Sequence, residues 1–202
     1  MTLALQIGHL SDSKWKAFIA QQSAQSFSYA EVGATAGAMP DGYSAYRGRE
    51  GLGCGEACFR HAKSALDEWR QLRLGWLDVF PKGVPLKAGE VVAVGARIAG
   101  IWSLNACRII YVIDQQVPIA RYGFAYGTLP DHVAVGEERF VVEWDPTDDR
   151  VWFEIAVFSR PKHWLARIGY PALVYVQRRF RREAPRAMRQ AIDSQIASPV
   201  AS

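Results

Sequence analysis

Five successive segments in the middle of the chain alternate with a period of two, and only short turns separate them. The segments are EVVAVGARI, ACRIIYVI, RYGFAYGTL, EERFVVEW and VWFEIAVF. A period of two is typical of β-strands, because successive side chains point to opposite faces of a sheet. Connections this short join antiparallel neighbours. The pattern therefore predicts a single antiparallel meander over residues 91–160.

A helical period precedes this meander. Apolar residues recur there at intervals of three or four and form one stripe: Phe59, Ala62, Leu66, Trp69 and Leu72. Such a stripe predicts a helix over residues 59–72 that packs against the sheet through this face. Trp69 lies in the middle of the stripe, and we expect it to be buried.

The helical period returns after the meander. A second apolar stripe is spaced for a long helix that begins near Pro171: Leu173, Val176, Phe180, Ala184 and Met188. Proline lacks the backbone N–H that a helix interior needs, so we expect Pro185 to kink or end this helix near Ala184.

Two further strands, near residues 43–50 and 74–80, bring the expected number to about seven. The sequence thus predicts an α+β fold, with a curved antiparallel sheet packed on a long C-terminal helix. This plan resembles the helix-grip fold of the START and Bet v 1-like proteins, in which a bent sheet and a terminal helix enclose an internal cavity. A short helix over residues 12–22 precedes the sheet.

The composition fits one soluble domain. Half of the 202 residues are hydrophobic, which supplies a core, and no apolar run approaches the roughly 20 residues of a membrane span. The N-terminus shows no basic leader followed by an apolar core, so we expect a cytoplasmic protein. Three cysteines suggest neither a disulfide framework nor a metal site, and the phosphate-binding and hydrolase motifs are missing. We expect no metal and no cofactor.

Positive charge gathers at the C-terminal end. Residues 161–202 contain eight Lys or Arg and two Asp or Glu. Arg178, Arg179 and Arg182 are candidates for contact with an anionic membrane surface, and the alternative is an ordinary solvated helix face. Nucleic acid is not an expected partner, because no exposed aromatic residue alternates with these arginines.

Several segments together resemble one protein family. They are AEVGAT at 30–35, PDGY at 40–43, GLGCGEACFRHAKSALDEWR at 51–70, GFAYGTLPDHVAVGEERF at 123–140 and FSRP at 158–161. The chain is similar there to the bacterial and plant family known as domain of unknown function 1990. Asp131 and Val133 depart from the family pattern, which has Gly and Pro at these places. The resemblance implies no particular activity.

The resemblance also divides the chain, which we expect to form a single domain over residues 1–202. It implies an N-terminal extension with a short helix over residues 1–28 and a family core over residues 29–188. The remaining residues, 189–202, are expected to form a disordered tail.

Aromatic and hydroxyl side chains mark a candidate ligand wall. Tyr122, Tyr126 and Thr128 share one strand face by the period of two, and Trp102 and Tyr111 on the preceding strand are further ligand-binding candidates. The opposite face of the Tyr122 strand is small, since it carries Gly123, Ala125 and Gly127. Either a covering helix or a ligand can approach such a face closely.

His132 and Glu138 are the first candidate acid–base pair. Glu138 leads the apolar face that contains Phe140, Val142 and Trp144, while Glu137, Arg139, Val141 and Glu143 form a face that looks solvated. His132 lies in the turn just before. A histidine and a carboxylate at one cavity rim suit proton transfer near neutral pH. The alternative is that both side chains only tie down the turn.

Glu154 is the third catalytic candidate, because it is the one acid in an aromatic run, VWFEIAVF. A carboxylate in such surroundings either pairs with a cation or has a raised pKa. Arg97, Arg108 or Arg121 on a neighbouring strand is the expected partner if the role is structural. Otherwise Glu154 is a buried general acid.

Two functions remain open from the sequence. The first is binding of an apolar small molecule in an internal cavity, with acid–base catalysis such as cyclisation, dehydration or isomerisation. The second is a peripheral membrane or lipid-handling role for the basic C-terminal helix. Whether the protein is an enzyme is left open at this point.

Overall fold

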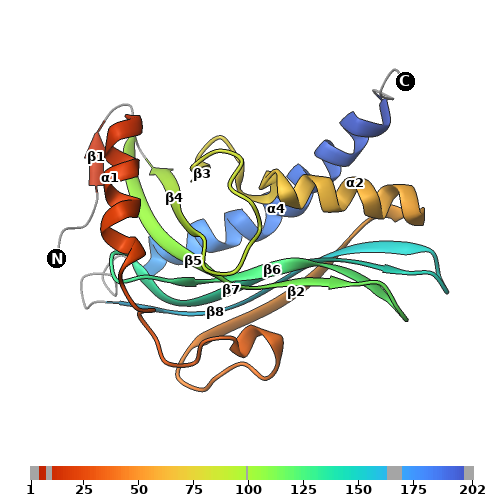
Figure 1. Ribbon diagram of the computed structural model, residues 1–202, viewed down its shortest axis with the longest axis horizontal. Helices are drawn as coiled ribbons and strands as arrows, with labels where there is room; N and C mark the ends of the chain where they lie inside the picture. The colour runs from red at the N-terminus through yellow and green to blue at the C-terminus, as the bar shows by residue number, and fades with distance from the viewer. Residues whose placement is uncertain (1–4, 8–10, 99, 163–169, 198–202) are drawn as a thin grey trace.

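A computed structural model describes residues 5–7, 11–98, 100–162 and 170–197, and it contains one large sheet with helices on both sides (Figure 1). The strands are β1 (Leu5–Ile7), β2 (Ser44–Cys54), β3 (Leu77–Phe80), β4 (Val91–Ile98), β5 (Ile101–Gln115), β6 (Ala120–Thr128), β7 (Ala134–Asp145) and β8 (Arg150–Pro161). The helices are α1 (Asp12–Ser23), α2 (Gly55–Asp67) and α4 (Tyr170–Ala197), with short 3-10 turns η1 (Ala34–Ala36) and η2 (Arg70–Leu72).

The predicted meander is confirmed. Strands β4 to β8 are neighbours in chain order, and every pairing in the sheet is antiparallel. β3 extends the sheet beside β4, and β2 extends it beside β8. The seven strands follow the order β2-β8-β7-β6-β5-β4-β3, and the short β1 adds an eighth by pairing with β5. Irregular register between Ile109 and Tyr111 and between Gly51 and Gly53 bends the strands.

Helices α2 and α4 lie together on one face of the sheet (Figure 1). We call this the inner face. Its core is rich in large rings that are almost fully buried: Trp69, Phe124, Phe140, Phe153 and Phe180. The expectation that the terminal helix and the preceding helix cover the sheet is therefore confirmed, and the curved sheet packed on a C-terminal helix is the helix-grip arrangement.

Helix α2 ends earlier than expected, at Asp67 rather than at residue 72. Trp69 adopts a left-handed backbone conformation (φ 58°), which turns the chain out of the helix and into η2. The indole is 1% exposed, as predicted, and its ring centroid lies 4.7 Å from that of Phe124. The indole N–H donates a hydrogen bond of 3.0 Å to the Val84 carbonyl. Burial and this bond hold a conformation that a tryptophan rarely adopts.

Helix α4 ends later than expected. It continues through Pro185 to Ala197. Of the two alternatives for Pro185, a helix end near Ala184 is therefore wrong, and so is the expected disordered tail over residues 189–197. Met188 and Ile192 are at most 1% exposed. Burying two such side chains contributes about 1.5–3 kcal/mol each, which offsets the roughly 3 kcal/mol that a proline costs inside a helix. Residues 198–202 lie outside the described part of the chain.

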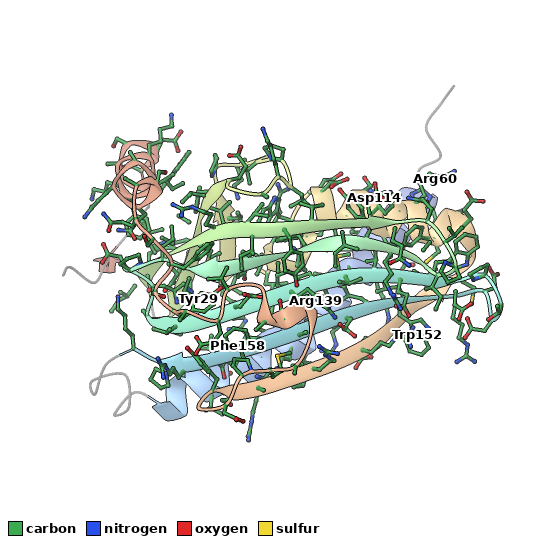
Figure 2. All side chains as sticks on the ribbon, turned by 60° about the horizontal axis from the view of Figure 1, so that its bottom comes forward. Tyr29, Arg60, Asp114, Arg139, Trp152 and Phe158 are labelled. Carbon is green, nitrogen blue, oxygen red and sulfur yellow. The ribbon has the colours of Figure 1, made fainter. Side chains whose placement is uncertain are left out.

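The outer face of the sheet is covered as well, which the sequence did not indicate. Trp15 and Phe18 of α1 pack on Leu104, Ala106 and nearby residues of β4 and β5. The segment over residues 24–43 crosses the outer face of β6, β7 and β8, where Tyr29 packs on Phe158 (Figure 2). The sheet is therefore a middle layer between two covers.

Candidate functional site

Tyr126 and Glu138 form a hydrogen-bonded pair on the inner face. They lie directly opposite each other on β6 and β7. The Tyr126 hydroxyl donates a hydrogen bond of 2.7 Å to Glu138 Oε2. The sequence grouped Tyr126 with Tyr122 and put Glu138 on the apolar face of its strand; the structure has both on the inner face, and the cross-strand register brings them into contact.

Aromatic rings surround this pair. The Tyr126 ring lies 5.7 Å from that of Phe140 and 6.5 Å from that of Trp69. Burial raises the pKa of Glu138 to about 7, although the Tyr126 hydrogen bond and the positive charge of Arg181 act in the opposite direction. Burial also raises the pKa of the Tyr126 phenol well above its ordinary value. Glu138 therefore exchanges its proton near neutral pH, while Tyr126 stays a hydrogen-bond donor.

A guanidinium from α4 faces the same carboxyl group. Glu138, Val157 and Tyr46 lie directly opposite one another on β7, β8 and β2, so their side chains share the inner face. The Arg181 guanidinium lies over the Tyr46 ring at 3.9 Å. Tyr126, Glu138, Val157, Tyr46 and Arg181 together make up what we call the Glu138 site.

The large rings lie on one side of the Glu138 site, and smaller side chains lie on the other. Cys107 is fully buried diagonally across from Tyr126, and its thiol is held protonated because burial raises its pKa. Ser159, two residues beyond Val157, accepts a hydrogen bond of 3.2 Å from Gln177 of α4. The site therefore stands between a packed aromatic core and a region of small, polar side chains.

His132 does not join this site, so the predicted His132–Glu138 pair is not formed. Its Nδ1 accepts a hydrogen bond of 2.9 Å from the Ala134 N–H in the turn before β7. Four strand residues, roughly 13 Å at 3.3 Å each, separate Ala134 from Glu138. Burial lowers the pKa of His132 to about 4, which keeps the ring neutral. These contacts match the alternative interpretation, in which His132 ties down the turn.

Glu154 lies on the outer face and is paired with Arg139 of β7. Glu154 thus forms a structural ion pair, but its partner is Arg139 and not one of the three expected arginines. Arg121 instead pairs with Glu143, and Arg108 donates to the Ser23 carbonyl. Glu154 and Glu138 lie on opposite faces of the sheet, so these two carboxylates do not act on one ligand.

Glu137 is the acid that the sequence missed. It was expected on a solvated face, yet it is 2% exposed. Its carboxylate accepts hydrogen bonds from Tyr29 Oη at 2.9 Å, from the Gly33 N–H at 2.7 Å, and from both the N–H and the hydroxyl of Thr35. This cluster, which we call the Glu137 hub, joins the segment AEVGAT to the segment GEERF. The one sequence signal for this contact is that both segments belong to the pattern shared with the family.

The remaining candidates lie in four different places. Tyr122 is on the inner face but donates to Asp67 of α2. The Thr128 hydroxyl accepts a hydrogen bond of 3.0 Å from the Gly136 N–H and lies 2.6 Å from the Ser28 hydroxyl. Tyr111 lies on the outer face, where its hydroxyl is 2.8 Å from that of Thr35. The irregular register beside Ile109 explains this position, because it reverses the alternation of faces along β5.

Trp102 also lies on the outer side, where its ring is next to Gly95 near Phe80. A surface pocket of about 380 Å³ lies nearby, lined by residues of α1 and by Glu90 and Val91. It contains none of the predicted site residues. Within the described ranges, no group of three or more His, Cys, Asp or Glu side chains is arranged to hold a metal ion.

Comparison with known proteins identifies the family. Residues 28–187 match the domain of unknown function DUF1990. The chain belongs to the DUF1990 family. The predicted resemblance is therefore confirmed, and DUF1990 relatives occur in distant organisms. A UPF0548 protein of Deinococcus radiodurans is 37% identical over 185 residues, which cover 85% of this chain and 90% of that protein. A UPF0548 protein of Dictyostelium discoideum is 38% identical over 151 residues, covering 71% of this chain and 70% of that protein.

Solved structures resemble this DUF1990 chain only loosely. Ara h 8.0201 has a TM-score of 0.45 at 13% identity and covers 76% of this chain and 99% of its own. Human STARD10 has a TM-score of 0.48 at 11% identity and covers 94% of this chain and 84% of its own. A likeness at this level says nothing about what the present chain binds.

Proposed function

We propose that this DUF1990 protein binds an apolar small molecule between the inner face of the sheet and α4, with the polar end of the molecule at the Glu138 site. We further propose that Glu138 exchanges a proton with the bound molecule and that, in the complex, the Tyr126 hydroxyl turns its hydrogen from Glu138 to the molecule. The apolar part of the molecule then lies among the side chains of the inner face.

One observation carries this proposal: a carboxyl group with a pKa of about 7 is held by a phenol among aromatic rings. A fold gains nothing in stability from placing an ionisable acid in such surroundings, because burial disfavours its charged form. An acid that titrates near neutral pH is, however, suited to general acid–base catalysis. The combination of an apolar wall with a few fixed polar groups is typical of small-molecule sites.

Proton transfer at one carboxyl group suits dehydration, cyclisation or isomerisation of the bound molecule. In each of these, a proton that leaves one atom of the substrate returns to another atom or leaves with water. Glu138 carries this proton in the proposal, and Tyr126 stabilises the developing charge on a substrate oxygen.

Binding can be tested with a neutral apolar dye, N-phenyl-1-naphthylamine, whose fluorescence rises when it leaves water. Ser159→Trp fills the inner face beside Val157 and is expected to abolish the fluorescence rise. Ala45→Trp is the matched control, because Ala45 is exposed and lies directly opposite Phe158 on the outer side. Equal dye binding by both variants would place the ligand elsewhere.

Catalysis can be tested on the molecules that co-purify with the protein, identified by native mass spectrometry. Glu138→Gln and Tyr126→Phe keep the shape of each side chain and change only its polarity. Both variants are expected to retain binding and to lower turnover. For Glu138→Gln we expect turnover to fall by a hundredfold or more. Turnover at the parental rate in both variants would show that the pair is structural.

A second candidate function rests on the outward side of α4. Tyr175 is 65% exposed, and Arg178 and Arg182 follow it at helical spacing on the same exposed stripe. An aromatic ring beside two arginines suits the surface of an anionic membrane. Arg179, the third expected arginine, is instead engaged with Glu183 at 2.8 Å and lies over Trp76. No helix in the described ranges is long and apolar enough to cross a membrane.

Sedimentation with phosphatidylcholine vesicles, with and without phosphatidylserine, tests this second function. The protein is expected to sediment only with the phosphatidylserine vesicles, and Arg178→Gln with Arg182→Gln is expected to abolish sedimentation. Arg47→Gln with Arg60→Gln removes the same charge from two exposed positions elsewhere and serves as the control. If both double variants sediment alike, α4 is an ordinary solvated helix.

A further inference from the structure

We infer that the molecule bound at the Glu138 site is a carboxylic acid with an apolar body, and that Arg181 binds its carboxylate. This inference rests on the proposed function and names the class of ligand that the same site takes. It comes from the placement of one guanidinium relative to one carboxyl group.

Arg181 is fixed in place but is not neutralised. Its guanidinium stacks on the Tyr46 ring at 3.9 Å, so its planar face is already occupied. Among the residues that the structure describes, none forms an ion pair with it, whereas Arg179 and Arg182 both lie within 4 Å of Glu183. The N–H groups at the edge of the guanidinium are therefore available to an anion, and two parallel hydrogen bonds to a carboxylate match their geometry.

An apolar side chain, Val157, lies between the strand position under Arg181 and Glu138. Tyr46 and Glu138 are two strands apart, or roughly 10 Å between backbones, and Val157 lies between them. Arg181 is close enough for its charge to lower the pKa of Glu138, yet the two groups do not form an ion pair. In the inferred complex the ligand carboxylate lies over Val157, with the guanidinium on one side and Glu138 on the other.

Charge selects the carboxylate over other anions. One ligand carboxylate and Glu138 share a single proton, so the pair carries one negative charge, which the guanidinium balances. A phosphate monoester has up to two negative charges and faces Glu138 with net repulsion. A neutral alcohol leaves the guanidinium without a counter-ion. The flanking rings of Phe140 and Tyr126 suit an apolar chain or ring as the rest of the molecule.

Displacement of N-phenyl-1-naphthylamine by three ligands with the same chain tests the inference: dodecanoic acid, dodecan-1-ol and dodecyl phosphate. The parent protein is expected to bind the acid at least tenfold more tightly than the alcohol or the phosphate. Arg181→Gln is expected to reduce this ratio to about one. Arg186→Gln, which removes an exposed charge from the same helix, is expected to keep it. Because the measured quantity is a ratio of affinities, partial unfolding of a variant does not affect it.

Four outcomes decide between the inference and the proposed function. Equal affinity for the acid and the alcohol in the parent protein overturns the inference but leaves apolar binding intact. Tighter binding of dodecyl phosphate than of the acid overturns the choice of carboxylate. If the dye does not bind, or if none of the three ligands displaces it, the proposed function fails together with the inference. A preference for the acid that survives in Arg181→Gln shows that another group selects it.

Discussion

The Tyr126 hydroxyl donates a hydrogen bond of 2.7 Å to the carboxyl group of Glu138, the residue directly opposite it on the next strand. This contact depends only on register, because both residues belong to regular strands. It gives the sheet one ionisable acid on its apolar face, and that acid should be visible in the pH dependence of folding.

Glu138→Gln should change how stability depends on pH. A carboxyl group whose pKa is raised from 4.5 to about 7 holds its proton more tightly in the folded state than in the unfolded state. Its contribution to stability is therefore greatest below pH 4.5 and is lost as the pH rises through 7, by up to roughly 3 kcal/mol. Relative to the parent, the glutamine variant is expected to gain stability over this interval, measured by urea unfolding. Asp41→Asn, at an exposed position, should follow the parent curve.

His132→Asn should act in the opposite sense. The pKa of His132 is lowered from 6.5 to about 4, so the neutral ring stabilises the fold above pH 6.5. That stability is lost as the pH falls to about 4, again by up to roughly 3 kcal/mol. Asparagine keeps an acceptor for the Ala134 N–H but does not titrate. Measured relative to the parent, the urea midpoint of the variant is expected to rise as the pH falls through this interval, and a constant difference between the two proteins would contradict the assignment.

Trp69 should be the most sensitive position between α2 and the sheet. Trp69→Ala removes a ring that is 1% exposed and is expected to lower the free energy of unfolding by about 3–5 kcal/mol. Trp69→Phe keeps a ring but loses the hydrogen bond to Val84 and should cost less than Trp69→Ala. Thermal unfolding of both variants checks this order. Trp152→Ala, on a partly exposed ring under Arg49, is the control and should have a much smaller effect.

The Glu137 hub should hold the segment over residues 24–43 on the sheet. Glu137→Gln replaces one acceptor oxygen with an NH2 group, which faces other donors. Hydrogen bonds to the charged carboxylate are therefore lost or weakened, and each such bond contributes about 1.5–3 kcal/mol. Limited proteolysis within residues 24–43 is expected to accelerate by at least tenfold. Asp41→Asn lies in the same segment and tests whether loss of charge alone has this effect. Cleavage at the parental rate in Glu137→Gln would show that apolar packing alone holds the segment.

The sequence predicted what depends on local periodicity. The alternation along β6 grouped Tyr126 with the other large side chains, that along β7 put Glu138 with the apolar ones, and the spacing around Phe180 predicted the helix that covers them. Where local periodicity is broken, the face on which a side chain lies could not be read from the sequence. The irregular register at Ile109 moves Tyr111 to the outer face.

Long-range contacts were the other limit. Glu137 looked solvated because its strand neighbours are charged, but residues a hundred positions away cover it. Pro185 looked like a helix end because its effect on the backbone is local, while the burial of Met188 and Ile192 that offsets it comes from tertiary packing. Arg181 was counted only as part of a basic segment, since nothing in the sequence indicates which arginine stacks on Tyr46.

Glu137 and Glu138 are consecutive residues with opposite surroundings, one bonded to the outer segment and the other facing α4. Deleting or inserting a single residue in β7 between Gly136 and Phe140 would exchange their faces and place the wrong carboxylate in each environment. Neither the four hydrogen bonds of Glu137 nor the single bond of Glu138 would survive the exchange. Length variation among natural relatives should therefore be excluded from this stretch and concentrated in the turn between β7 and β8, where Asp145 to Arg150 are exposed or nearly so.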